Sequence, residues 1–262
     1  AKAEMSINAK ENQAESYLLR ANALYALGRE NEAQPDLQLV ARVKPQLAFD
    51  LHHDAYVLID EEGAPEDVVR LESLAIAIKP DVPNLYVNRA YSYTDLQQNQ
   101  KAIDDCTFAL SLKPKDADIA NSLLQNRANA YNGAHLYKEA LQDSELALKG
   151  TSTDEEDRWR ILIGKVDALI GLKKFTEAVA SCDQAMELIG DDNQWLVDFI
   201  ELKITALKGR HNNALKDSEQ IAKLQEECKR LKSALAAEGK EELEKEDKEK
   251  EEQEKFRQEI KQ

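Results

Sequence analysis

Residues 83–114, PNLYVNRAYSYTDLQQNQKAIDDCTFALSLKP, are the stretch from which the fold can be inferred. Apolar and small side chains recur at helical spacing over residues 85–93 and again over residues 102–112. Pro114 ends the second segment, because proline cannot continue a helix. The stretch therefore predicts two amphipathic helices joined by a short turn. Each apolar stripe is too wide for one hairpin to bury, so the hairpin needs neighbours on both sides.

Looser copies of this hairpin recur along the chain at spacings of 34 to 38 residues. In the first helix of each copy one slot for a small side chain holds Ala21, Ala55, Ala90, Ala128, Val166 and Leu202. In the second helix the matching slot holds Ala33, Val68, Ala102, Ala140, Ala178 and Ala214. The copies lie near residues 14–47, 48–82, 83–116, 117–152, 153–192 and 193–222. No domain boundary is expected between residue 14 and about residue 237.

The turns and the two ends of the chain carry further expectations. Glycines fall between the two helices of five copies, where a left-handed C-terminal cap needs no Cβ: Gly28, Gly63, Gly133, Gly171 and Gly209. Residues 1–13 are interpreted as the end of a preceding, truncated repeat. The last helix continues to about residue 237 with a heptad-like seam, which either covers the final repeat or pairs with a second chain as a coiled coil. Residues 238–262 are a charged tail, helical or disordered.

Composition limits the classes of partner. The net charge of −15 argues against a nucleic-acid backbone or an anionic lipid surface as the main partner. No apolar run approaches the roughly 20 residues that a membrane span needs. Three widely spaced cysteines favour a reducing compartment, so a cytoplasmic location is expected.

The period, the paired helices and blocks such as EALQDSELALK and EAVASCDQAMEL resemble the tetratricopeptide repeat family over about residues 14–222. The resemblance implies an all-α, right-handed superhelical solenoid of about six helical hairpins with a long C-terminal capping helix. It also implies that the first helices line a concave groove that binds a segment of another protein.

The side chains expected to face that groove are polar or aromatic, and they are Asn22, His53, Tyr56, Asn84, Asn88, Tyr91, Asn126, Asn129 and Arg160. Amide side chains both donate and accept hydrogen bonds, so a row of asparagines can hold the main chain of an extended peptide. The alternative is that these are ordinary solvent-facing positions of the helices. The acidic chain favours a neutral or basic partner segment, and the leading hypothesis is a non-enzymatic interaction scaffold.

Some members of the family bind the acidic C-termini of heat-shock chaperones through asparagines, lysines and an arginine, and this defines the alternative function of a co-chaperone adaptor. Here Asn22 matches the first asparagine, but Leu18 and His53 occupy the places of a lysine and the second asparagine. Asn84 and Asn88 replace the cations of the third repeat, which would weaken carboxylate binding. No catalytic set, cofactor motif or metal-binding pair is found, since His52 and His53 are adjacent and point apart.

Overall fold

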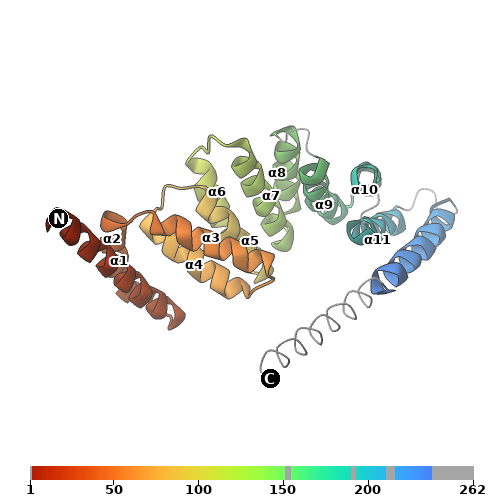
Figure 1. Cartoon of the computed structure of the whole chain (residues 1–262). Coiled ribbons are helices and arrows are strands. Elements are labelled where there is room, and N and C mark those ends of the chain that lie inside the picture. Colours follow the sequence, from red (N-terminus) through yellow and green to blue (C-terminus); the bar gives the residue numbers. More distant parts are fainter. Residues whose placement is uncertain (1, 151–154, 190–192, 211–215, 238–262) are drawn as a thin grey trace, which may run out of the picture. The chain divides into compact units, whose positions relative to one another are not determined.

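The computed structural model describes residues 2–150, 155–189, 193–210 and 216–237, and every regular element in these ranges is a helix (Figure 1). The helices are α1 (Lys2–Ala26), α2 (Glu30–Val43), α3 (Leu47–Asp60), α4 (Pro65–Ile78), α5 (Asn84–Asp95), α6 (Asn99–Ser111), α7 (Ala117–Gly133), α8 (Tyr137–Gly150), α9 (Glu155–Gly171), α10 (Phe175–Ile189), α11 (Asn193–Gly209) and a last helix over residues 216–237. The prediction of an all-α chain of consecutive hairpins is confirmed. Residues 2–13 are continuous with α1, and the charged tail beyond residue 237 lies outside the described residues.

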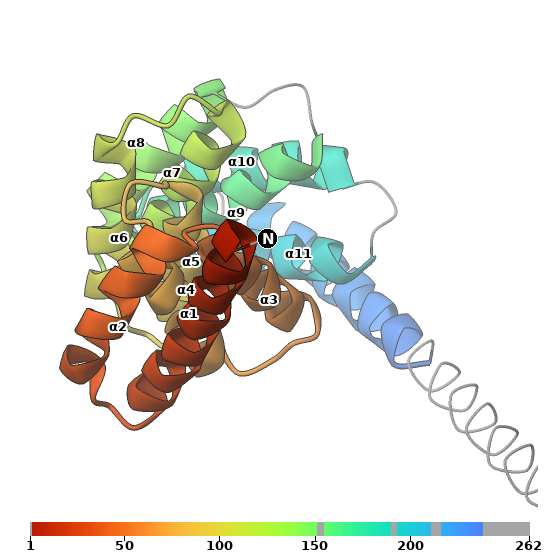
Figure 2. The same ribbon diagram turned by 60° about the vertical axis from the view of Figure 1, so that its left-hand side comes forward.

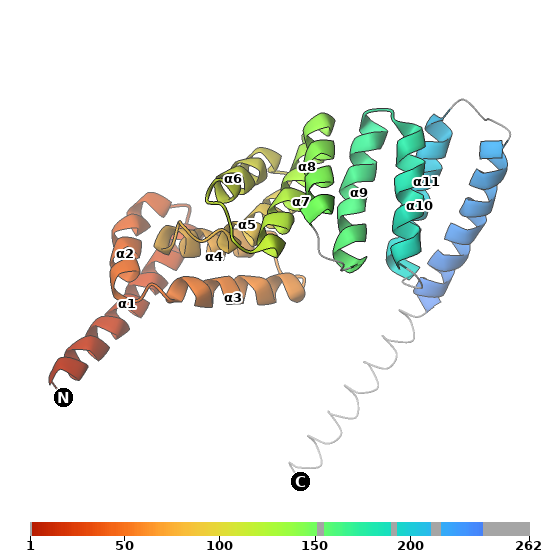
Figure 3. The same cartoon turned by 90° about the horizontal axis from the view of Figure 1, so that it is seen from above.

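The chain divides into two compact units, an N-terminal unit of residues 1–153 and a C-terminal unit of residues 154–262. The N-terminal unit contains α1 to α8, in which each odd-numbered helix packs against the next even-numbered one. The C-terminal unit contains α9 to α11 and the last helix, and Figure 3 shows α9 and α10 running antiparallel. Each unit thus stacks hairpins in chain order.

Small residues allow the helices of each hairpin to cross closely. The small-residue slots predicted for the first five repeats are all buried, and they hold Ala21, Ala33, Ala55, Val68, Ala90, Ala102, Ala128, Ala140, Val166 and Ala178. Leu202, at the corresponding place in α11, is only half-buried. Ala214 lies outside the described residues.

Each of the first five hairpins turns through one left-handed residue at the same place, and only the first of these is a glycine. The five residues are Gly28, Glu62, Gln97, His135 and Lys173. The amide that follows each one bonds back to a carbonyl five residues earlier, as in Gln98 N to Tyr93 O at 2.7 Å and Lys174 N to Leu169 O at 2.8 Å. This is the Schellman cap, whose hydrogen bonds offset a conformational cost of about 1 kcal/mol. The sequence analysis expected a left-handed glycine in five turns, and among the described glycines only Gly28 has a positive φ.

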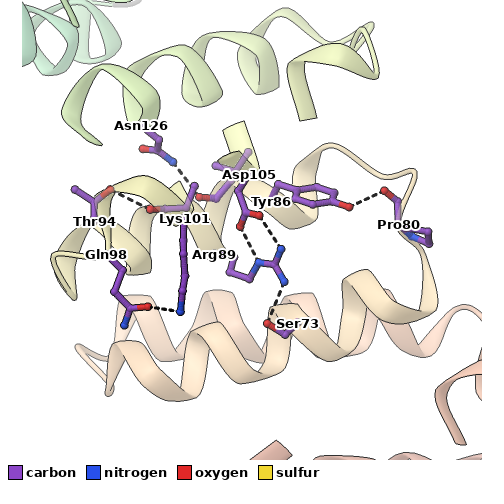
Figure 4. A network of polar contacts seen from close by, with 11 residues as sticks. Ser73, Pro80, Tyr86, Arg89, Thr94, Gln98, Lys101, Asp105 and Asn126 are labelled. Carbon is purple, nitrogen blue, oxygen red and sulfur yellow. Dashed lines mark hydrogen bonds and ion pairs between the residues drawn. The ribbon is translucent and has the colours of Figure 1, made fainter. Parts of the chain in front are cut away.

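An ion pair links the two helices inside three hairpins, and it is largely buried in the third and fourth hairpins, whereas the arginine of the first is 63% exposed. The arginine just before the small residue of the first helix binds an aspartate sixteen positions later, in the pairs Arg20–Asp36, Arg89–Asp105 and Arg127–Asp143. In Figure 4 the Arg89 guanidinium lies between Asp105, at 2.7 Å through two nitrogens, and Ser73 of α4 at 3.1 Å. The fork-like geometry suits a carboxylate, so the pair fixes how the two helices are rotated relative to each other.

The second hairpin lacks this ion pair and packs differently. Its sequence reverses the two charges, with Asp54 before the small residue and Arg70 sixteen positions later. Arg70 instead bonds to Asn22 of α1 and to Asp67 at 2.6 Å. The first hairpin is therefore contacted mainly by α4 and not by α3. Figure 2 shows this hairpin, α1 and α2, at the front.

The last helix closes the C-terminal unit. Leu224, Cys228 and Leu231 of its seam are buried within the single chain. The Lys232 Nζ bonds to Glu201 Oε1 of α11 at 2.5 Å, and the Cys228 Sγ lies 3.8 Å from the same oxygen. These contacts fit the interpretation of the seam as a cover for the final repeat. Burial also raises the pKa of the Cys228 thiol, so this side chain is not an activated nucleophile.

Candidate functional site

Two of the predicted groove asparagines belong to a polar cluster between the second and third hairpins. Asn84 Nδ2 lies 2.9 Å from His52 Nε2, and Asn88 Nδ2 donates to Glu72 Oε1 at 2.9 Å. His52 Nδ1 lies 2.7 Å from the same oxygen of Glu72. Glu72 is fully buried, and burial raises its pKa although His52 and Asn88 act in the opposite direction. Asn88 therefore binds the buried carboxyl group directly, and Asn84 binds the histidine that contacts it.

Two further predicted asparagines join neighbouring hairpins. Asn22 accepts a hydrogen bond from Arg70 of α4. Asn126 is buried, and its Nδ2 donates to the main-chain carbonyl of Val87 in α5 at 2.9 Å (Figure 4). These amide groups bind parts of the protein itself. Their position at helix contacts explains why asparagines recur in the first helices.

The remaining predicted residues reach the surface to different extents. His53 and Arg160 are exposed, and Asn129 is half-buried. Tyr56 of α3 is 59% exposed and Tyr91 of α5 is 46% exposed. Tyr56 follows His52 by one turn, and Tyr91 follows Asn88 by three residues, so both rings lie just beyond the contact between the two helices. Two aromatic side chains are thus presented by adjacent first helices.

A groove that the sequence analysis did not identify lies between α9 and α11 in the C-terminal unit. It has a volume of about 420 Å³ and is lined by Ile163, Asp167, Trp195, Asp198, Glu201, Leu202 and Thr205. The ring of Trp195 packs against that of Trp159, with the centroids 4.9 Å apart and the planes tilted by 41°. The Arg160 guanidinium lies over the Trp159 ring, 5.5 Å from its centroid.

The groove is acidic, and two of its carboxylates lack partners. Glu201 is bound by Lys232, whereas Asp167 and Asp198 form no hydrogen bond or ion pair with another described residue. Burial raises the pKa of Asp167 to about 6 and also raises that of Asp198, on which Glu201 acts in the same direction and Lys232 in the opposite one. The sequence did contain a signal for a contact between these helices, because Trp159 and Trp195 are 36 residues apart, which is the length of one repeat.

A second recess, of about 530 Å³, lies in the N-terminal unit where α4 meets the first and third hairpins. Tyr25 and Tyr93 contribute aromatic rings to its lining. Acidic and basic side chains both line it, for example Glu30 and Lys101, so its charge favours neither an anion nor a cation.

Within the described ranges, no group of three or more histidine, cysteine, aspartate or glutamate side chains is placed to hold a metal ion. No described helix combines the length and the apolar character that crossing a bilayer requires.

Comparison with known proteins agrees with this architecture. The family model for the tetratricopeptide repeat matches residues 14–47 and 83–116, which are the first and third hairpins. The Ethylene-overproduction protein 1 of Arabidopsis thaliana is 35% identical over 86 residues, which are 33% of this chain and 9% of that protein. The matched region is thus a small part of that relative.

Two solved structures share the fold. MamA (residues 41 to the end) from Desulfovibrio magneticus RS-1 gives a TM-score of 0.54 at 15% identity, over 71% of this chain and 96% of that one. A tetratricopeptide repeat protein from Parabacteroides merdae gives a TM-score of 0.52 at 17% identity, over 81% of this chain and 80% of that one. With its two matched repeats and its consecutive helical hairpins, the chain is a tetratricopeptide repeat protein.

Proposed function

We propose that the protein is a non-enzymatic scaffold that binds an extended or helical segment of another protein along its first helices. The observation that carries the proposal is the exposure of Tyr56 and Tyr91 on adjacent first helices of the N-terminal unit. Large aromatic side chains that remain exposed in a folded protein are typical of interaction surfaces, where tyrosine contributes contact area at low entropic cost.

The predicted asparagines would have an indirect role in this scaffold. Asn84, Asn88 and Asn126 form hydrogen bonds inside the unit, so they would hold α5 and α7 in place while His53, Tyr56 and Tyr91 touch the partner. Three free, buried cysteines support a reducing compartment such as the cytoplasm.

The test is affinity purification with mass spectrometry on the wild type and on a Tyr56→Ala/Tyr91→Ala variant. We expect partners of the wild type to be lost, with at least a tenfold weaker binding, about 1.4 kcal/mol. Leu146→Ala is the matched control, because Leu146 is similarly exposed but lies on the second helix α8. The proposal would be overturned if partners still bound the tyrosine variant but no longer bound the Leu146→Ala control.

The same experiment addresses the co-chaperone alternative. Heat-shock chaperones that are captured by the wild type and lost when their acidic C-termini are deleted would favour that function. Asn22 accepts a hydrogen bond from Arg70 through its oxygen, and Leu18, Asn84 and Asn88 stand where the carboxylate-binding members carry cations. A scaffold for other segments is therefore the preferred assignment.

A further inference from the structure

We propose that the groove between α9 and α11 binds a lysine or arginine side chain that a partner protein presents on an apolar segment. This inference rests on the proposed scaffold function and names the chemistry that one part of the scaffold recognises. The groove lies in the C-terminal unit and shares no residue with the Tyr56–Tyr91 surface.

The shape of the groove suits a long side chain with an apolar stem. Ile163 on α9 and Leu202 on α11 supply aliphatic wall, and Trp195 supplies an aromatic face. A volume of about 420 Å³ falls within the range of pockets that enclose small groups. The methylene stem of a lysine or arginine can lie along such walls while its charged end reaches a polar group.

The charge of the groove selects a cation. Its lining contains three carboxylates and no basic side chain. One of them, Glu201, already holds the Lys232 ammonium of the last helix at 2.5 Å, so a lysine can reach a groove carboxylate with good geometry. Asp167 and Asp198 form no ion pair with a described residue, although Lys232 lies near enough to favour the charged form of Asp198. An arriving cation would complete the pairing.

Burial strengthens that preference. The pKa of Asp167 is raised to about 6 because the surrounding protein removes water from its carboxyl group, and at neutral pH this side chain is still charged. A charged carboxylate without a partner in a half-buried place is unfavourable, so pairing it with a cation gains more than the same pair would gain in water. An anionic ligand would be repelled, and a purely apolar segment would desolvate both aspartates further.

Trp195, which lines the groove, offers a second interaction to the same ligand. The Arg160 guanidinium already lies 5.5 Å from the centroid of the Trp159 ring, which packs against Trp195. Tryptophan is the most favourable ring for a cation–π contact. The groove therefore combines three carboxylates with the indole ring of Trp195, and both kinds of group attract a guanidinium or an ammonium.

The test uses the full chain and a displayed library of random peptides that lack tryptophan. Peptides selected by the wild type should carry lysine or arginine next to apolar residues. Their binding can be measured through the fluorescence of Trp159 and Trp195, which are the only tryptophans of the sequence. Replacing the arginine of a selected peptide with uncharged citrulline should weaken binding at least tenfold, and this readout does not depend on any protein variant.

A protein variant supplies the second measurement. Asp167→Asn/Asp198→Asn should weaken binding of the selected peptides at least tenfold. The control Glu187→Gln/Glu219→Gln, which removes two exposed charges elsewhere in the same unit, should change binding less than twofold.

The outcomes separate the two proposals. Selected peptides without a basic residue, or binding that survives both the citrulline and the aspartate replacements, would overturn the cation pocket and leave the scaffold function standing. No selection of any peptide by the wild type would count against both.

Discussion

Replacing Asp167 with asparagine should stabilise the C-terminal unit at neutral pH and leave it nearly unchanged in acid. Asp167 lines the α9–α11 groove, and burial raises its pKa from the ordinary 3.8 to about 6. A carboxyl group whose pKa is raised by folding favours the folded state in its neutral form. Its stabilising contribution is therefore complete below pH 3.8 and is lost as the pH rises through about 6.

The size of the effect follows from the shift in the pKa. The shift is about two units, and each unit corresponds to about 1.4 kcal/mol, so the ionised Asp167 lowers the free energy of unfolding by about 2 to 3 kcal/mol above pH 7. The asparagine does not titrate. The advantage of Asp167→Asn should then grow from under about 1 kcal/mol near pH 4 to about 2 to 3 kcal/mol above pH 7.

Urea unfolding followed by tryptophan fluorescence measures this difference directly, because both tryptophans of the chain lie in the C-terminal unit. Wild type and variant are compared at several pH values from about 4 to about 8, each at low protein concentration. The exposed Glu187 offers the control Glu187→Gln, which should stay within about 0.5 kcal/mol of the wild type throughout. An advantage that is the same at every pH, or a loss of stability at neutral pH, would refute the reasoning.

Three other substitutions test the packing and the turns. Ala102→Leu should lower the thermal midpoint measured by circular dichroism, at a cost of about 1 to 3 kcal/mol, because Ala102 is fully buried at a helix crossing; an unchanged midpoint would place it elsewhere. Gly209→Ala should destabilise the C-terminal unit by about 1 to 3 kcal/mol in urea, since a Cβ would lie 2.3 Å from the Phe175 ring, and a smaller side chain at 175 should restore part of the loss. Lys173→Gly should raise the free energy of unfolding measured in urea by about 0.5 to 1 kcal/mol, because Lys173 is left-handed with φ of 60°, and a decrease would mean that its side chain matters more than its backbone.

The hairpins could be predicted from the sequence because close helix crossings accept only small side chains. Small residues such as Ala90 and Ala128, which are buried, recur at a regular spacing, and this recurrence predicts the hairpins directly. The turns were harder, because a Schellman cap tolerates a residue such as Gln97 when its hydrogen bonds are good. The identity of a turn residue is thus a weaker signal than the spacing of the core.

The polar residues could not be assigned from their positions alone. Asn88 was expected to face a ligand, but the sequence does not reveal that Glu72, sixteen residues earlier, is buried against it. The α9–α11 groove depends on which faces of two helices remain uncovered, and that depends on packing across the whole unit. Asp167 and Asp198 look like ordinary solvated acids until α9 and α11 are placed side by side.

The ion pair between the two helices of a hairpin also bears on how such a chain can change over time. Arg89 and Asp105 belong to the same hairpin, as do Arg127 and Asp143, and the partner that each arginine finds in the preceding hairpin is an uncharged hydroxyl. Copying or deleting one whole hairpin therefore leaves no buried charge without its counter-ion in the copies on either side. Repeats of this kind can be gained or lost in single steps, and the second hairpin, with its charges reversed, shows that one copy can drift from the pattern while its neighbours keep it.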